Sequence, residues 1–273
     1  MKQIAPFAIL FEDEYIAAVN KAAGIPVSPD RWDDTKDRLD KLVAGFLAGR
    51  AGEKRLYTVH RIDQDTSGLV VFAKDAETHR LLSKAFEDRQ VKKRYIAVVH
   101  GRPGWEETVC DLPLVPNGNK RHLTIIDKYR GKKSLTRFRV LGGAGSYSAI
   151  EAVPATGRTH QIRVHLAHLG CPVVCDPLYG SPKSVLLSSF KRNWRGDPLA
   201  ETPLLARLGL HAAELELPPY RPGSPAEAPD PEGGEFSGPP GALRLEAPLA
   251  RDMAALIKQM EKQAGKRFMN ERF

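Results

Sequence analysis

The sequence has few cysteines and no long apolar run, and each shortage excludes a class of protein. Its 273 residues include only three cysteines, Cys110, Cys171 and Cys175, too few for a disulfide framework and typical of a reducing cytoplasm. No stretch reaches the roughly 18 apolar residues of a membrane span. The first apolar run is also too short for the core of a signal peptide. We therefore expect a cytoplasmic protein that has no membrane partner.

The composition is that of a folded and moderately basic protein. Hydrophobic residues make up 42% of the chain and charged residues 27%, which is ordinary for globular domains. The 41 Lys and Arg outnumber the 33 Asp and Glu, giving a net charge of +8 that favours a polyanionic partner. We predict one domain over 1–273, with an exposed Pro/Gly-rich loop inserted at 218–241 and a terminal helix at 251–273.

Hydrophobic patterning predicts a mixture of strands and helices. Helical spacing of apolar residues is found at 39–49, 75–94 and 159–170, the last with Thr159 as its cap and Gly170 as its stop. A markedly basic segment, 119–139, has β-branched and aromatic residues between its cations and is predicted to form hairpin strands. The other strands are expected at 11–20, 68–74, 94–101 and 146–154, and on both sides of the loop at 210–218 and 241–248.

The densest group of polar residues stands directly before the apolar strand expected at 68–74. Loops that a rigid strand fixes at one end often carry catalytic groups. A turn whose Asp and Thr side chains satisfy backbone N–H groups explains the pattern equally well, so both interpretations stay open. The group comprises His60, Arg61, Asp63, Asp65, Thr66 and Ser67.

A second polar group lies at 156–165, at the start of the predicted helix 159–170. There His160 and Arg163 are three residues apart and share a face, away from the apolar stripe. A guanidinium at this place could pair with a carboxylate and keep it ionised. A solvated basic face is the alternative.

Two patterns resemble metal sites, but we expect no metal. His165, His168, Cys171 and Cys175 have ligand-like spacing, yet Gly170 breaks the helix between them and zinc sites usually join two separated pairs. Asp63 and Asp65 could hold Mg²⁺ if they lay on a strand, but they belong to a turn. No phosphate-binding loop and no serine-hydrolase motif is present.

Four motifs follow one another in a fixed order. They are NKAAGIPVSP (20–29), HRIDQDTSGLVVFAK (60–74), KKRYIAVVHG (92–101) and TGRTHQIRVHLAHLGCPVVCDPLYG (156–180). Together they closely resemble the motifs of the RluA-like family of RNA pseudouridine synthases, and the segments 131–141 and 210–217 also fit. The resemblance covers the chain from about Phe11 to the terminal helix. One departure is Ala22, where the family usually has proline.

The resemblance implies an isomerase that converts specific uridines of structured rRNA or tRNA to pseudouridine, without a metal or nucleotide cofactor. It implies an α+β fold: a long, mostly antiparallel mixed sheet flanked by helices, with an active-site cleft across its middle. Residues 1–273 would then be a single catalytic domain of the short form, which lacks the N-terminal S4-like RNA-binding domain. We expect it to act as a monomer.

The resemblance also assigns roles to individual residues. Asp63 is the essential carboxylate, acting as nucleophile or base, and Arg163 is expected to pair with it. Tyr95 is expected to lie on the target base, and Arg61 to fill the space that the flipped base leaves. Phosphate contacts are expected from the basic segment and from the outer face of helix 75–94. The other expected RNA contacts are His60, Thr66, Arg158, His160, Lys132 and Lys133.

Two other functions stay open. One is an RNA-binding or chaperone protein with a vestigial active site, in which Asp63 would be dispensable. The other is a metal-dependent nuclease that uses Asp63 and Asp65, and whose activity EDTA would abolish.

Overall fold

The computed structural model describes residues 5–29, 37–51, 55–119, 123–190, 194–221, 223 and 241–269. Most of the predicted 218–241 loop therefore lies outside the described residues, as do Lys120 and Arg121 of the basic segment. The chain divides into two compact units. One is Met1–Lys93 with Ala212–Pro248, and the other is Arg94–His211 with Leu249–Phe273. Whether they make up a single domain stays a prediction.

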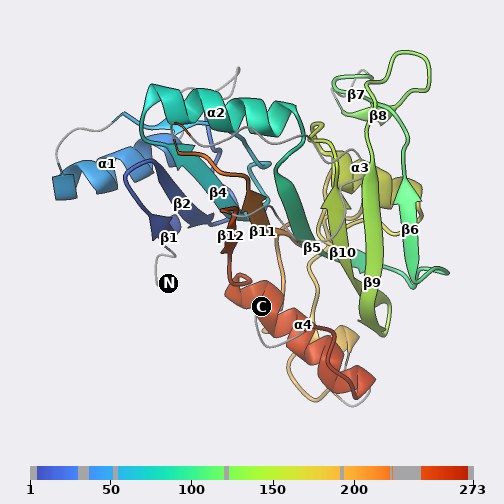
Figure 1. Ribbon diagram of the computed structural model, residues 1–273. Helices are drawn as coiled ribbons and strands as arrows, with labels where there is room; N and C mark the ends of the chain where they lie inside the picture. Colours follow the sequence, from blue (N-terminus) through green and yellow to red (C-terminus); the bar gives the residue numbers. More distant parts are fainter. Residues whose placement is uncertain are drawn as a thin grey trace. The chain divides into compact units, whose positions relative to one another are not determined.

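The first unit contains a sheet with the strand order β1-β2-β4-β11, to which β12 is added beside β11 and β3 beside β4 (Figure 1). β11 contributes its residues from Ala212 onwards. The elements are β1 (Phe7–Glu12), β2 (Ile16–Lys21), α1 (Leu39–Ala51), β3 (Tyr57–Thr58), β4 (Ser67–Ala73), α2 (Ala76–Glu87), β11 (Leu210–Leu217) and β12 (Leu243–Glu246).

Helix α2 covers one face of these strands. Asp75 caps it, since the Asp75 side chain accepts the backbone N–H of Thr78 at 2.8 Å. Its inner residues Leu82 and Ala85 join a buried cluster with apolar residues of β2, β4, β11 and β12. The helix ends at Glu87, where Arg89 takes up a left-handed backbone with φ 63°. The predicted helix 75–94 is thus too long. The predicted first helix, 39–49, is too short, because α1 continues to Ala51.

The second unit contains an antiparallel sheet with the order β5-β10-β9-β6 and a separate two-stranded ribbon, β7-β8. β5 contributes its residues from Arg94 onwards. The elements are β5 (Lys92–His100), β6 (Glu107–Cys110), β7 (Leu114–Val115), β8 (Ile125–Ile126), β9 (Thr136–Ala144), β10 (Tyr147–Pro154), α3 (Gln161–His168), a 3₁₀ turn (Leu187–Ser189) and α4 (Arg251–Ala264).

The two helices of this unit are held differently. α3 packs Ile162 and Leu166 into a core with alternate residues of β5 and β10 and with Phe138 of β9. α4 buries an apolar stripe of Met253, Leu256, Ile257 and Met260, the residues that the sequence pattern indicates. It ends at Ala264 because Gly265 is left-handed (φ 68°), so the predicted helix 251–273 is too long.

The α+β class and the mostly antiparallel pairing are confirmed. The two units are described separately, so the position of the active-site cleft stays a prediction. None of the helices in the described ranges is long and apolar enough to cross a membrane.

Candidate active site

Asp63 lies in a tight turn that leads directly into β4. The backbone N–H of Thr66 donates to the carbonyl of Asp63 at 3.1 Å and closes the turn. β4 is buried along its whole length, which fixes one end of the turn. Asp63 is half-buried, whereas Asp65 is exposed. The two carboxylates of the D-x-D pattern therefore have different surroundings.

The turn is fixed at a second point, by the loop that follows β2. Gly24 (φ 92°) and Gln64 exchange two hydrogen bonds, from Gly24 N–H to the Gln64 carbonyl at 2.9 Å and from Gln64 Nε2 to the Gly24 carbonyl at 3.0 Å. The buried ammonium of Lys21 donates to the carbonyls of Ala22, Ile25 and Gln64 at 2.8–2.9 Å. The first motif of the sequence thus holds the turn of the second.

Replacing Lys21 by methionine should loosen this connection. The change removes the hydrogen bonds from Lys21 to three carbonyls, of which that of Gln64 keeps the N–H of Gly24, so we expect Lys21→Met to lower the free energy of unfolding by about 3 kcal/mol. Urea unfolding measures it. Lys84→Met, which removes an exposed ammonium of α2, is the control and should change the unfolding midpoint little. Equal midpoints for the two variants would contradict the structural role of Lys21.

His60 supports the same turn from within the unit. Its ring stacks on Phe86, with centroids 4.6 Å apart, and its Nε2 accepts the backbone N–H of Val71 at 3.0 Å. Burial, with a smaller effect of the Lys93 charge, lowers the pKa of His60 from 6.5 to about 3. The imidazole is therefore neutral near pH 7 and carries its proton on Nδ1. His60 thus has a structural role within this unit, and its contact with RNA stays a prediction.

The lowered pKa of His60 predicts a loss of stability in weak acid. Unfolding raises its pKa towards 6.5, so the unfolded chain binds the proton more readily. The stability that the neutral ring provides is complete above about pH 6.5 and declines as the pH falls towards 3. Denaturant unfolding from pH 7.5 to 4.5 should show a smaller decline for His60→Gln than for the wild type. His168→Gln, at an exposed position, should retain the wild-type decline.

The other predicted site residues of this unit differ in exposure. Arg61 is exposed, and its predicted entry into RNA stays a prediction. Thr66 is only 1% exposed, and within the described part of the chain its hydroxyl makes no hydrogen bond. Direct contact between Thr66 and RNA stays a prediction.

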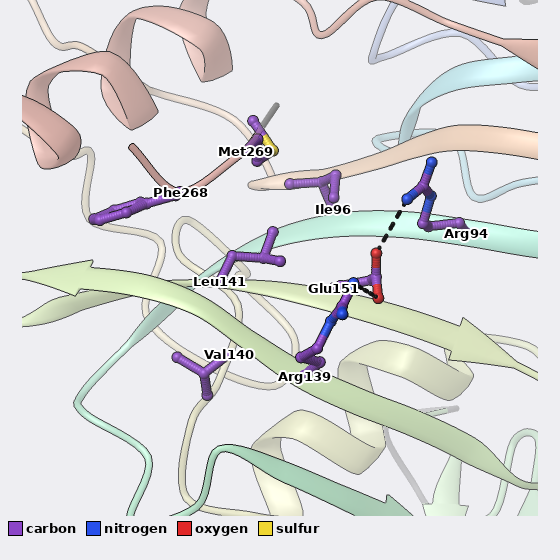
Figure 2. Close-up of a pocket in the computed structure, with 8 residues that line it drawn as sticks. All are labelled: Arg94, Ile96, Arg139, Val140, Leu141, Glu151, Phe268 and Met269. Atoms are coloured by element: carbon purple, nitrogen blue, oxygen red, sulfur yellow. Dashed lines mark hydrogen bonds and ion pairs between the residues drawn. The ribbon is translucent and has the colours of Figure 1, made fainter. Parts of the chain in front are cut away.

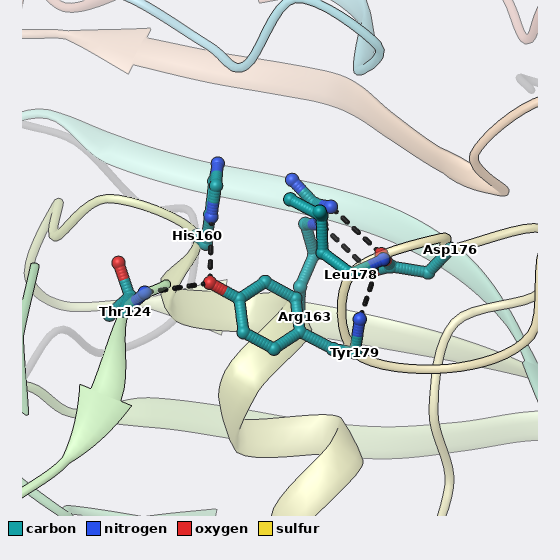
Figure 3. A network of polar contacts seen from close by, with 6 residues as sticks. All are labelled: Thr124, His160, Arg163, Asp176, Leu178 and Tyr179. Atoms are coloured by element: carbon teal, nitrogen blue, oxygen red, sulfur yellow. Dashed lines mark hydrogen bonds and ion pairs between the residues drawn. The ribbon is translucent and has the colours of Figure 1, made fainter. Parts of the chain in front are cut away.

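In the second unit, Arg163 is buried rather than on a solvated face. It is 3% exposed and pairs with Asp176 through two hydrogen bonds, Nε–Oδ2 and Nη2–Oδ1, each 2.8 Å long (Figure 3). The predicted cap Thr159 is wrong, because α3 begins at Gln161. The residue before it, His160, has a left-handed backbone (φ 54°) and no side-chain cap bond. Arg163 therefore lies in the first turn of α3, whose residues from Gln161 to Leu166 are all buried.

Asp176 and Tyr179 complete a network around this arginine. Burial alone would raise the pKa of Asp176, but the hydrogen bonds and charge of Arg163 lower it overall, so the carboxylate stays ionised. The Arg163 guanidinium lies 5.2 Å from the centre of the Tyr179 ring. The Tyr179 oxygen accepts the N–H of Thr124 at 3.0 Å and lies 2.8 Å from His160 Nδ1 (Figure 3). Sequence reasoning missed both residues. The sequence offers only the aspartate of CDPLYG as a signal, because nothing local shows that Arg163 is buried and needs a counter-ion.

The residues with metal-like spacing have other partners. His165 Nε2 lies 3.0 Å from the Leu112 carbonyl and must donate to it, so Nδ1 accepts the hydroxyl of Thr136 at 3.0 Å. Cys175 Sγ lies within hydrogen-bond distance of two carbonyls, those of Lys183 at 3.4 Å and Leu205 at 3.5 Å, and its single S–H can donate to either. Among the residues that the structure describes, no three His, Cys, Asp or Glu side chains gather where they could hold a metal ion.

Tyr95 is half-buried on β5 beside Ala152 of β10, and it packs against the core that α3 covers. Its neighbours Arg94 and Ile96 point to the opposite face of the sheet, because side chains alternate along a strand. That opposite face has a cavity of about 280 Å³ (Figure 2). In it Glu151 pairs with Arg94 at 3.3 Å and with Arg139 at 2.9 Å. The cavity is therefore separated by the sheet from Tyr95 and α3.

The remaining predicted RNA contacts of this unit lie around the ribbon. Lys132 and Lys133 are exposed, and Arg158 Nε donates to the Lys133 carbonyl at 3.2 Å. His160, half-buried, is connected to the start of β8 through Tyr179 and Thr124. Arg163, Arg158, His160 and the two lysines thus belong to one connected region of the second unit.

The first unit has a half-buried carboxylate, Asp63, in a turn that is fixed at two points. The second unit has exposed lysines on the chain between β8 and β9, and such basic segments are typical of proteins that bind nucleic acid. The family model described as RNA pseudouridylate synthase matches residues 15–168, more than half of the chain. The chain belongs to this family of RNA-modifying isomerases.

Individual relatives agree. The chain is 37% identical over 217 residues to "Ribosomal large subunit pseudouridine synthase D" of Zymomonas mobilis, a match that covers 78% of this chain and 65% of that protein. It is 32% identical over 256 residues to "Uncharacterized RNA pseudouridine synthase YlyB" of Bacillus subtilis, covering 93% and 73%. The chain thus spans less than two thirds of the Zymomonas enzyme. The solved structure "Human RNA Pseudouridylate Synthase Domain Containing 4" is 24% identical with a TM-score of 0.66, covers 92% of both chains, and supports the fold alone.

Proposed function

We propose that this protein isomerises specific uridines of structured rRNA or tRNA to pseudouridine, with Asp63 as the essential carboxylate. The observation that carries the proposal is the turn at 63–66, which lies inside the family match and holds Asp63 half-buried between β4 and the Lys21–Gln64 contacts. A relative's name mentions the large ribosomal subunit, so large-subunit rRNA is the first substrate to try.

The reaction needs a carboxylate and no redox or phosphate chemistry. The N1–C1′ bond of the uridine breaks, the uracil turns, and C5 bonds to C1′. C5 then loses its proton to a base and N1 gains one, so atoms and electrons balance. A carboxylate can add to C1′ or stabilise positive charge on the sugar, and it can accept the C5 proton.

Other residues would support this carboxylate. We assign to Arg163 the role of keeping Asp63 charged and oriented, since a buried guanidinium stabilises the ionised form of a carboxylate with which it pairs. Tyr95 would stack on the target base, and Arg61 would fill the place that the flipped base leaves. Three reduced, buried cysteines support action in the cytoplasm. A monomer without cofactor remains our expectation.

The test is direct conversion of RNA. Purified protein is incubated with unmodified large-subunit rRNA and with tRNA transcripts, with and without EDTA, and pseudouridine is located by carbodiimide labelling and primer extension. We expect new pseudouridine at defined sites, intact strands, and no effect of EDTA. Folded protein that converts no uridine in either RNA would overturn the proposal. Strand cleavage that EDTA abolishes would favour the nuclease.

A further inference from the structure

One aromatic ring of the second unit stands out into solvent among positive charges. It belongs to residues 127–133, between β8 and β9, which we call the basic loop. Tyr129 in this loop is 99% exposed. The exposed cations beside it in the loop are Lys128, Arg130, Lys132 and Lys133. We propose that Tyr129 stacks on an unpaired base of the RNA substrate while these cations contact the neighbouring phosphates, an inference that rests on the proposed function.

Hydrogen bonds within the basic loop fix the backbone that carries Tyr129. Asp127 Oδ1 accepts the backbone N–H of Tyr129 at 2.9 Å and that of Arg130 at 3.0 Å, and Oδ2 pairs with Arg130 Nε at 2.7 Å. The N–H of Gly131 donates to the Asp127 carbonyl at 2.9 Å. A side chain at Gly131 would collide with Asp127 and Pro113. Asp127, the one acidic residue of the loop, thus fixes the backbone at Tyr129 and Arg130.

The loop is also tied to the region that holds Arg163. Lys132 and Leu114 of β7 exchange two backbone hydrogen bonds, of 2.9 and 3.0 Å. At the other end, the N–H of Thr124, just before β8, donates to the phenol oxygen of Tyr179, whose ring lies against Arg163. Two strands and a hydrogen-bonded tyrosine therefore connect the basic loop to α3. The basic loop and Arg163 therefore belong to one connected part of the second unit.

The chemistry of the loop indicates which partner it fits. An exposed ring is a stacking platform for any base, since every base has a π face, and lysine and arginine contact phosphate without sequence preference. The fit is to an unpaired or splayed nucleotide, because bases inside an RNA stem are already stacked on each other. A second fully exposed residue, Leu199 at 98%, lies between Asp197 and Glu201 rather than between cations, so it provides a control.

Binding of an unmodified large-subunit rRNA fragment, measured against salt concentration, separates stacking from charge. We expect Tyr129→Ala to weaken binding by about five-fold or more, with an unchanged slope of log K against log salt. Tyr129→Phe should bind like the wild type. Lys128→Ala should reduce the slope by about one, and Leu199→Ala should change nothing. Tyr129→Trp should gain a fluorescence component that this RNA quenches and that the wild type lacks.

Two results would overturn the inference. One is wild-type affinity of Tyr129→Ala, and the other is a loss in Tyr129→Phe as large as that in Tyr129→Ala, which would assign the effect to the hydroxyl. With RNA that the enzyme modifies, Tyr129→Ala should raise KM and leave kcat unchanged. Binding is measured independently of catalysis. A wild type that binds RNA but isomerises no uridine would therefore contradict the proposed function and leave the inference about Tyr129 standing.

Discussion

Asp63→Asn is expected to lower the rate of pseudouridine formation by about 10⁴-fold or more, the scale of loss when an essential catalytic group is removed. The amide has nearly the size of the carboxylate and leaves the backbone bonds of the 63–66 turn in place. It can neither add to C1′ nor accept a proton from C5. The rate is measured in single turnovers at saturating RNA, with the folded state checked by its unfolding midpoint.

Asp65→Asn is the matched control for this experiment. Asp65 is two residues away in the same turn, but it is exposed, and we assign it no catalytic role. It should retain activity within a few-fold of the wild type. If Asp63→Asn kept wild-type activity, or if both variants lost it equally, Asp63 would not be the essential carboxylate.

Asp176→Asn is expected to cause the second-largest change, in stability as well as in activity. Arg163 is almost fully buried and keeps its charge, so the variant leaves a guanidinium opposite an amide that offers one acceptor atom instead of two. Breaking one side of a buried pair costs about 3–5 kcal/mol of unfolding free energy. Activity should fall with it at temperatures where the variant is still folded, because Arg163 loses its orientation.

The chain offers a close control for that variant. Arg207 and Asp252 form a second pair with the same two-bonded geometry in the same unit, at 2.6 and 2.7 Å, but their side chains are 21% and 37% exposed. Solvent weakens such a pair, so Asp252→Asn should cost about 1 kcal/mol or less. Equal losses for the two variants would contradict the claim that burial of Arg163 makes its pair decisive.

The buried pair of Arg163 and Asp176 also predicts how the stability of the protein depends on pH. The pKa of Asp176 is lowered in the folded state, so the stability it contributes is present above its unfolded pKa of about 4 and is lost as the pH falls through the folded value. Wild-type stability should therefore decline in acid below about pH 4. Asp176→Asn lacks this contribution and should decline less over that range.

Several parts of the fold follow from the sequence alone. The run 68–74 is apolar along most of its length, and β4 is buried throughout. The terminal helix shows its buried face as a clear repeat from Met253 to Met260. The end of α2 did not follow, because it depends on a left-handed backbone at Arg89, and arginine gives no local signal of it.

The candidate site was predictable in its motifs but not in its surroundings. The sequence marks Arg163 as a candidate site residue, but it does not show that the side chain is buried. α3 has only eight residues and is buried from Gln161 to Leu166, so it lacks the contrast between an apolar and a polar face from which burial is predicted. Its partner Asp176 stands 13 residues further on, in a turn whose geometry only the tertiary fold determines. His60 shows the same limit, since its neutral state depends on packing against Phe86.

The most direct measurement of the central claim is site-resolved mapping of pseudouridine in cellular RNA. RNA from a strain without the gene is compared with RNA from the same strain carrying the wild type or Asp63→Asn. We expect a uridine whose modification disappears in the knockout, returns with the wild type and stays absent with Asp63→Asn. If no site changes, or if Asp63→Asn restores the modification, this carboxylate does not carry out the reaction, and an RNA-binding role for the protein becomes the better explanation.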